Sequence, residues 1–198
     1  MHLFIELFTL FSFLICIVEA LRSRGATGGW FFFAALTMGV VRENFVIVRD
    51  YLYGFAPLTL MVGKAPLIGA IIWGFSIYAC IVWAEVVSGE RFDRTPPTPR
   101  FTGLVCLFLL SLAFFFEPFL KLIDMARWQA GTRSVLDVPL IAMIGYPSMT
   151  ALFLAMWGPL LGPDRPPARR AGGIVVAMTA ISLLHVVALQ GLKGALGW

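Results

Sequence analysis

The chain has 198 residues, of which 60% are hydrophobic and only 13% charged, and its mean hydropathy is +0.89. A soluble domain has about a quarter of its residues charged, so this composition excludes a soluble globular protein. It indicates an integral membrane protein. The net charge of +4 fits contact with anionic lipid and does not indicate nucleic acid binding.

Taken in chain order, six apolar windows are long enough to cross the hydrocarbon core, which takes roughly 20 helical residues. They cover residues 2–21, 30–49, 65–87, 101–125, 137–161 and 171–193. No long polar stretch separates them. We therefore expect a single integral membrane domain over residues 1–198, an all-α polytopic bundle of about six transmembrane helices. No internal repeat is apparent, which disfavours an inverted-repeat transporter.

Basic residues between the windows predict the orientation. Eight of them follow the first, third and fifth windows: Arg22, Arg24, Arg91, Arg94, Arg100, Arg165, Arg169 and Arg170. Five lie on the other side: Arg49, Lys64, Arg127, Arg133 and Lys193. The positive-inside rule then places both termini outside, in a multi-pass protein of the inner (cytoplasmic) membrane. The first window lacks a basic start and a cleavage site, so we expect it to be retained.

Ionisable residues inside four different windows are predicted to reach a similar depth. They are Glu6, Glu43, Glu117 and His185. A charge at the bilayer centre costs about 2.5–3.5 kcal/mol on insertion scales, so such residues face the bundle interior and find partners. We expect a buried polar layer in the outer half of the bilayer. A purely structural reading, with pairs such as Arg42–Glu117 or Glu43–Lys121 holding helices together, remains open.

The fourth window adds acidic and basic positions near that layer. Helical spacing predicts one shared face for Glu117, Lys121, Asp124 and Trp128. Pro118 is expected to kink this helix, because it removes a backbone donor. Glu19 and Glu85, near the other ends of their windows, are expected to reach the membrane interface rather than the interior.

The sequence contains no motif typical of metal or cofactor binding. Its only histidines are His2 and His185, and Cys16, Cys80 and Cys106 have no paired spacing. No P-loop or dinucleotide fingerprint is present, so we expect no metal and no cofactor. Buried carboxylic acids remain. One that stays protonated can donate to a carbon–carbon double bond, while a second positions water or removes a proton. The chemistry indicated is hydration or cyclisation of an isoprenoid.

Two stretches carry a resemblance to a known family. In "RENFVIVRDYLYGFAPLTLMVGKAPLIGAIIWGFSIY", an acid (Glu43) precedes an aromatic pair, a proline step at 65–67, and then a Trp and a Tyr. Later, Asp124 and Trp128 precede a Gly-Tyr-Pro step at 145–147 and Trp157. These motifs resemble the integral-membrane carotenoid biosynthesis proteins, which include carotenoid 1,2-hydratases of the bacterioruberin and myxol types. Asp50, Ser148 and Met149 depart from the family pattern. The resemblance implies addition of water to a terminal double bond of an acyclic carotenoid.

From these observations we assign expected roles. Glu43 is the expected proton donor, oriented by Arg42 and Asn44, while Glu117 and Asp124 are candidates for positioning water or removing a proton. Lys121 would keep one of those acids ionised. The complete expected substrate-binding set is Arg42, Asn44, Tyr51, Tyr53, Trp73, Tyr78, Lys121 and Trp128. The tyrosines and Trp128 would flank the polyene or stabilise a carbocation.

Two other functions fit the same residues. A membrane-embedded terpenoid cyclase also starts by protonation, but it needs a dry pocket where a hydratase needs a path for water. A non-catalytic structural or pigment-holding subunit would have a fully paired polar layer with no cavity beside it. The expected partners are the lipid bilayer and an isoprenoid or carotenoid dissolved in it. A homo-oligomer, or association with neighbouring enzymes of a pathway, is compatible with each reading.

Overall fold

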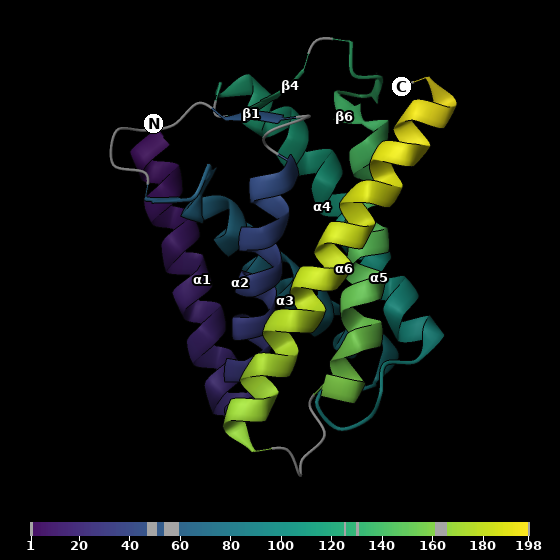
Figure 1. The fold of residues 1–198 in the computed structure, drawn as a ribbon. Helices are drawn as coiled ribbons and strands as arrows, with labels where there is room; N and C mark the ends of the chain where they lie inside the picture. Colours follow the sequence, from purple (N-terminus) through teal and green to yellow (C-terminus); the bar gives the residue numbers. More distant parts are fainter. Residues whose placement is uncertain are drawn as a thin grey trace.

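The computed structural model describes residues 2–46, 51–53, 60–124, 126–129, 131–160 and 166–197. Within them the chain forms six helices: α1 (His2–Arg24), α2 (Ala26–Val46), α3 (Leu67–Ser88), α4 (Pro99–Leu122), α5 (Leu140–Leu160) and α6 (Pro167–Leu196). Short strands connect some of them: β1 (Tyr51–Tyr53), β2 (Met61–Val62), β3 (Ala65–Pro66), β4 (Ala126–Trp128), β5 (Ser134–Val135) and β6 (Val138–Pro139). Figure 1 shows a helical bundle with both termini at the end that carries the strands, here called the strand end.

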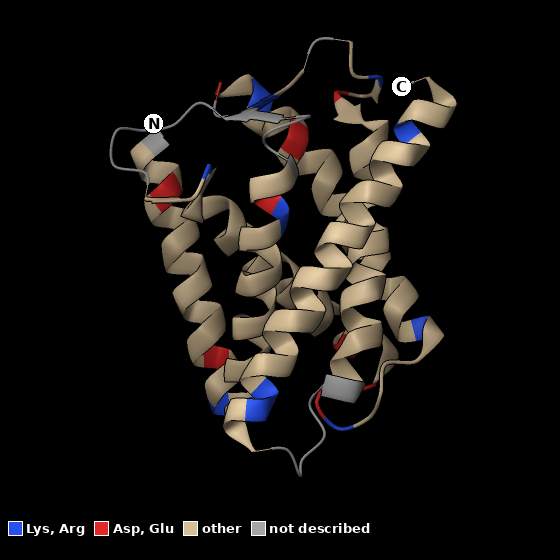
Figure 2. Ribbon diagram, viewed as in Figure 1, with Lys and Arg blue, Asp and Glu red and all other residues tan. Residues whose placement is uncertain are grey.

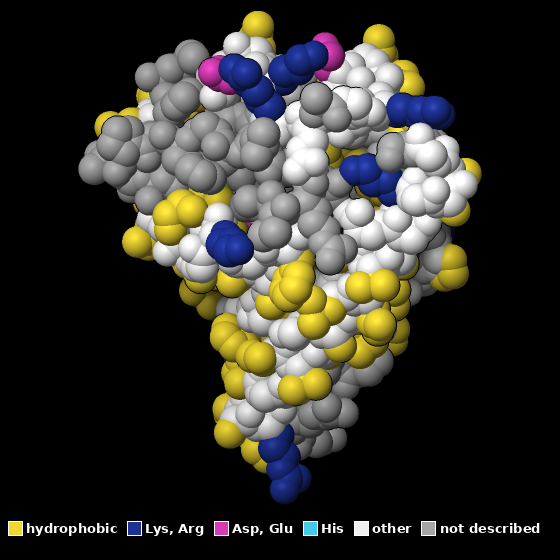
Figure 3. Space-filling view, turned by 45° about the horizontal axis from the view of Figure 1, so that its top comes forward, with side chains coloured by type: hydrophobic (Ala, Val, Ile, Leu, Met, Phe, Trp, Pro, Cys, Tyr) yellow, Lys and Arg dark blue, Asp and Glu magenta, His cyan; other side chains and the backbone are white. Residues whose placement is uncertain are grey.

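The apolar helices make this a multi-pass membrane protein. Five helices are long and apolar enough to cross a membrane: α1, α3, α4, α5 and α6. Hydrophobic side chains cover the middle of the molecule, and Lys and Arg lie toward its ends (Figure 3). The sixth helix, α2, contains Arg42, Glu43 and Asn44 and packs against α1, α3 and α6. The expected six spans and the outside termini stay predictions.

A repeat that the sequence analysis did not detect organises the bundle. The order α2–β1–β2–β3–α3 recurs as α4–β4–β5–β6–α5. The expectation of no internal repeat is therefore wrong. Both α2 and α4 run toward the strand end, so the two units have the same direction and are not inverted (Figure 1). Strand β1 pairs antiparallel with β4, with Tyr51 opposite Trp128 and Tyr53 opposite Ala126, which joins the two units.

Each unit places a tight hairpin just before its second helix. In the first hairpin, β2 pairs with β3 across a turn in which Gly63 has a φ of +68°. In the second, β5 pairs with β6 across a turn where Leu136 and Asp137 have φ values of 52° and 62°. Pro66 and Pro139 end the hairpins, and the helices begin at the next residue. Proline has no backbone donor to lose at a helix start, so it suits both junctions.

Close helix contacts and an aromatic cluster form the core of the bundle. Gly39 of α2 lies so near α3 that a Cβ there would be 2.8 Å from the Ala70 Cα. Phe31 is fully buried, and its ring lies 5.4 Å from those of Phe153 and Trp157. This packing fixes α2 between its neighbours and so fixes the depth of the polar residues near its end.

Candidate functional site

The first element of the candidate site is a buried carboxyl on α2. Glu43 is 5% exposed, and the indole Nε1 of Trp73 on α3 donates to its Oε1 at 2.6 Å. Gly69 makes room for this carboxyl, because a Cβ there would lie 3.3 Å from the Glu43 Cγ and 3.4 Å from its Oε2. A glycine one turn before Trp73 thus lets the acid lie against α3.

The second element is a matching carboxyl on α4. Glu117 is 3% exposed; its Oε2 accepts a hydrogen bond from the Trp128 indole at 2.7 Å, and its Oε1 accepts one from the Tyr146 hydroxyl. The rings of Trp73 and Tyr146 meet edge to face with their centroids 5.1 Å apart. The two glutamates are therefore joined through an aromatic pair, in which Trp73 donates to Glu43 and Tyr146 donates to Glu117.

The repeat explains this correspondence and reveals a signal that the sequence analysis missed. Val62 begins the run V-G-K-A-P-L-I, and Val135 begins V-L-D-V-P-L-I. Trp73 and Tyr146 are each the seventh residue after the proline of their run. Tyr146 was noticed only within the Gly-Tyr-Pro step. Its equivalence to Trp73 would have indicated a hydrogen bond to the second acid.

A buried cation contacts the indole ring that bonds the first carboxyl. Arg42 is 5% exposed, its guanidinium lies over the Trp73 ring at 4.7 Å, and its Nη1 contacts the Nδ1 of His185 at 3.0 Å. Because arginine is always a donor, that histidine nitrogen accepts, and the other donates to Ser148 Oγ at 2.8 Å. Arg42 thus contacts the residue that bonds Glu43, and its expected role in orienting that acid stays a prediction.

Asn44 has a different task from the one expected. Its amide nitrogen donates to the carbonyls of Val40 and Val62, at 2.8 and 2.9 Å, and its oxygen accepts from the Lys64 backbone N–H at 2.7 Å. The side chain ties the β2–β3 hairpin to α2. These contacts join Asn44 to the hairpin, and Asn44 does not line the pocket.

An apolar pocket lies beside the two acids. Glu43 and Glu117 both line it, together with residues of α3 and α4 and with Tyr146. Its cavity volume is about 70 Å³, so the pocket is narrow. Leu109, Leu112 and Phe116 form much of the α4 side. This lining suits an apolar group, with the carboxyls toward one end of the pocket.

Glu117 also lines a second, polar cleft at the strand end. That cleft has about 1100 Å³ of space, including its open part, and is lined by residues such as Lys121, Gln129, Thr132 and Asp137. One carboxyl therefore borders an apolar pocket on one side and an open polar cleft on the other. This arrangement can bring water to a group held in the pocket.

The expected single face of α4 is wrong beyond Lys121. The helix ends at Leu122, and Asp124 follows with a φ of 55°. Asp124 is exposed and pairs with Arg127, while Lys121 is exposed and pairs with Asp137. Trp128 reaches Glu117 from strand β4, not from the helix. Asp124 and Lys121 therefore line the polar cleft and lie outside the apolar pocket.

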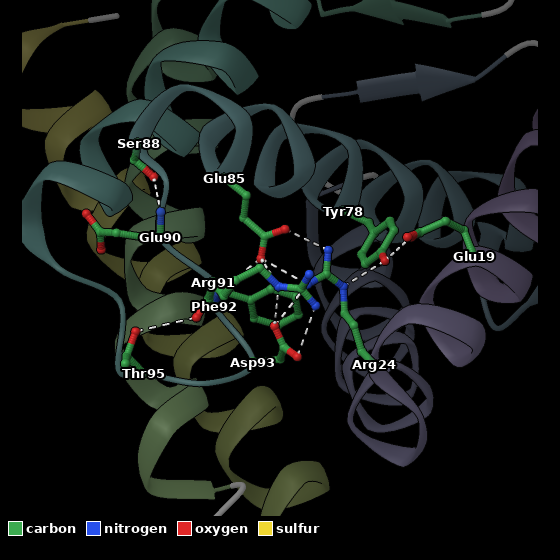
Figure 4. Close-up of polar contacts among 10 residues, drawn as sticks. All are labelled: Glu19, Arg24, Tyr78, Glu85, Ser88, Glu90, Arg91, Phe92, Asp93 and Thr95. Atoms are coloured by element: carbon green, nitrogen blue, oxygen red, sulfur yellow. Dashed lines mark hydrogen bonds and ion pairs between the residues drawn. The ribbon is translucent and has the colours of Figure 1, made fainter.

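Tyr78 belongs to a separate cluster toward the other end of the bundle (Figure 4). It accepts a hydrogen bond from Arg24 at 2.9 Å and donates to Glu19. Arg24 also makes two bonds to Glu85, at 2.9 and 2.8 Å, and pairs with Asp93 at 3.1 Å. Glu19 is exposed and accepts from Tyr78, while Glu85 is partly buried and bonded to Arg24, so the expectation that both reach the interface stays a prediction. Tyr78 was expected to contact the substrate, but it does not line the apolar pocket.

The remaining expected residues lie at the edge of what is described. Strand β1 contains the backbones of Tyr51 and Tyr53, and their side chains, like Asp50, lie outside the described residues. Glu6 is half-buried on α1 and is not part of the pocket lining.

Within the described part of the chain, no group of three or more His, Cys, Asp or Glu residues is placed to hold a metal ion. Figure 2 shows charged residues near both ends of the bundle and a basic–acidic pair on α2 inside it.

Comparison with family models, with curated proteins and with solved structures finds no match. The fold and site define a multi-pass helical membrane protein with paired buried carboxyls. Any finer assignment depends on the geometry described above.

Proposed function

We propose that this protein is a membrane-embedded enzyme that hydrates a terminal carbon–carbon double bond of an acyclic isoprenoid of the carotenoid class, by acid–base chemistry. The observation that carries the proposal is the shared position of Glu43 and Glu117 on one apolar pocket. A hydrocarbon chain dissolved in the bilayer fits such a lining. The resemblance of the segment around Glu43 to carotenoid 1,2-hydratases supports the same reaction.

Glu43 is the proposed acid. Its proton passes to the CH carbon of the terminal double bond, the π electrons form the new C–H bond, and a tertiary carbocation remains at the carbon that carries the two methyl groups. Trp73, whose ring contacts Tyr146, lines the pocket, and an indole ring can stabilise such a cation. Arg42 packs on this ring at 4.7 Å.

Glu117 is the proposed base. Hydrogen bonds to both of its oxygens stabilise the ionised form. A water molecule from the polar cleft forms the C–O bond to the carbocation and gives a proton to Glu117. Return of that proton to Glu43 through solvent restores both groups. The net change is addition of one water to the double bond, with no oxidant or reductant.

Two observations bear on the alternatives. A cyclase would use the same acid but needs no water, and the polar cleft at Glu117 favours hydration over it. A structural or pigment-holding subunit was expected to have no cavity beside the polar layer, and the pocket counts against that reading. Asp124, paired with Arg127 at the surface, has no part in the proposed chemistry.

Pigment analysis of a lycopene-producing host expressing the chain tests the proposal. We expect a product heavier by one water, absent with Glu43→Gln. The matched control is Glu19→Gln, which changes a glutamate of the Arg24 cluster and should leave the product in place. A product of unchanged mass and altered retention would establish cyclisation instead. Unmodified lycopene from well-expressed protein would overturn the assignment of a carotenoid substrate.

A further inference from the structure

Ser76 is a buried hydroxyl that lines the apolar pocket without a partner. It lies on α3 within one turn of Trp73 and is 4% exposed. Its Oγ makes no hydrogen bond within the described part of the chain. A buried hydroxyl without a partner costs free energy, so its presence in the lining requires a reason.

Three other helical hydroxyls in the described part of the chain are satisfied in the usual way, by the carbonyl four residues earlier. Ser111 donates to Leu107 at 2.9 Å, Ser182 to Met178 at 2.6 Å and Thr37 to Phe33 at 2.8 Å. The Ser76 hydroxyl does not use this bond. It therefore differs from a serine that merely tolerates an apolar helix.

The surroundings of Ser76 define what can satisfy it. Ile72, Leu109 and Leu112 line the same pocket and offer no polar side-chain atom. The acids lie farther along: Gly69, against which Glu43 packs, is two helical turns from Ser76, roughly 10 Å. A molecule that reaches both groups is apolar for most of its length and carries one oxygen at a distance from its reacting end.

We propose that Ser76 is a specificity-determining residue that hydrogen-bonds an oxygen of the substrate, so the pocket prefers an oxygenated isoprenoid over a pure hydrocarbon. The oxygen is a hydroxyl or carbonyl group roughly 10 Å from the double bond that the acids act on. This inference deepens the proposed function and rests on the pocket being its substrate site. It makes isoprenoids that already carry such an oxygen the preferred substrates of the pocket, while hydrocarbons such as lycopene are still accepted.

Binding measurements on the purified full chain test this without relying on turnover. The probes are farnesol and β-farnesene, isoprenoids of equal carbon number with and without a hydroxyl, and binding is followed by native mass spectrometry. We expect farnesol to bind more tightly by roughly three- to tenfold, the contribution of one hydrogen bond. In Ser76→Ala that preference should disappear, with β-farnesene binding unchanged.

Thr150→Val is the matched control. Thr150 is fully buried and its hydroxyl also lacks a partner, but it does not line the pocket. This variant should keep the preference for farnesol. The unliganded melting temperature should not fall in either variant, because each loses an unsatisfied hydroxyl.

Three outcomes would overturn the inference: equal binding of the two probes to the wild type, a preference retained in Ser76→Ala, or a preference lost in Thr150→Val as well. In each case, a hydrated pigment that depends on Glu43 would leave the proposed function standing. Failure of both probes to bind, together with no hydrated pigment, would reject the inference and the proposed function together.

Discussion

The rings of Trp73 and Tyr146 meet edge to face at 5.1 Å, and each ring donates a hydrogen bond to a different buried glutamate. The two residues occupy equivalent places in the two units of the repeat. This contact is one of several between the two units, and it lies between Glu43 and Glu117 in the chain of hydrogen bonds. The pair of acids is therefore a product of the repeat, and its geometry depends on both aromatic donors.

Removing one donor should weaken the site without removing the ring contact. Tyr146→Phe deletes the hydroxyl that bonds Glu117, so we expect about 1–3 kcal/mol lower stability from the buried acid that loses a donor. The rate of product formation per folded protein should fall by roughly tenfold or more, because the base is no longer held.

Tyr78→Phe is the control for that variant. Its hydroxyl bonds Arg24 and Glu19, and none of the three residues lines the pocket, so stability should fall while the rate per folded protein stays at the wild-type value. Equal rates for Tyr146→Phe and wild type would show that Tyr146 does not position Glu117.

Gly69→Ala should displace the Glu43 carboxyl and change the stability of the fold little. The added Cβ would lie 3.3–3.4 Å from the Glu43 side chain, so the carboxyl has to shift by a few tenths of an ångström. We expect roughly tenfold slower hydration from that displacement, with stability lowered little, since alanine favours a helix over glycine by about 1 kcal/mol.

The control for Gly69→Ala is Gly103→Ala on α4, where a Cβ meets nothing within 4 Å. That variant should gain slightly in stability and keep the wild-type rate. A normal rate in Gly69→Ala would mean that the Glu43 carboxyl is not held against α3 during the reaction.

The sequence predicted which residues form the polar layer but not which side chains they bond. Of the four residues expected in the layer, Glu43, Glu117 and His185 are at most 5% exposed, as is the neighbouring Arg42, whereas Glu6 is only half-buried. That inference succeeds because a charge within an apolar span has no favourable place except the interior. Side-chain partners were harder to predict, since Trp73 and Tyr146 reach their acids from other helices, 30 and 29 residues away.

The errors have physical causes that lie in long-range contacts. Helical spacing was extended through Asp124 and Trp128, but the chain leaves the helix at Leu122 and pairs β4 with β1. Glu85 was treated alone, whereas Arg24, 61 residues earlier, makes its burial favourable. A periodic pattern carries no information on such partners. The repeated Pro-Leu-Ile run was the one local signal that pointed to the architecture.

The Arg24 cluster should contribute to stability and not to catalysis. The side chains of Arg24 and Glu85 are 3% and 9% exposed, so Arg24→Ala leaves a buried carboxylate without its main partner. We expect about 3–5 kcal/mol of destabilisation, read from thermal unfolding in detergent. Arg127→Ala, which breaks a pair with side chains 65% and 63% exposed, should cost less than about 1 kcal/mol. Similar losses in both variants would contradict the structural role of the cluster.

Asp93, in the connection between α3 and α4, makes the stability of this cluster depend on pH. Burial alone would raise its pKa, but the hydrogen bond from Arg91 and the charges of Arg91 and Arg24 outweigh burial and hold the pKa below its usual 3.8. The contribution is therefore complete well above pH 3.8 and is lost as pH falls through the lowered pKa.

Thermal unfolding of wild type and Asp93→Asn over a pH series measures that contribution. The difference in melting temperature should be constant near neutrality and should shrink below pH 3.8. Asp124→Asn, at an exposed pair, should show little difference at any pH. A difference in melting temperature between wild type and Asp93→Asn that grows as the pH falls would contradict a lowered pKa of Asp93.

The measurement that tests the central claim most directly is isotope incorporation by the purified protein in liposomes containing lycopene. In ¹⁸O-labelled heavy water, we predict a product with one ¹⁸O and one carbon-bound deuterium, because water supplies the oxygen and Glu43 exchanges its proton with solvent. Glu43→Gln and Glu117→Gln should each slow its formation by about 10²–10⁴-fold, and Glu19→Gln should not. Product formed at the wild-type rate in both pocket variants would contradict the account.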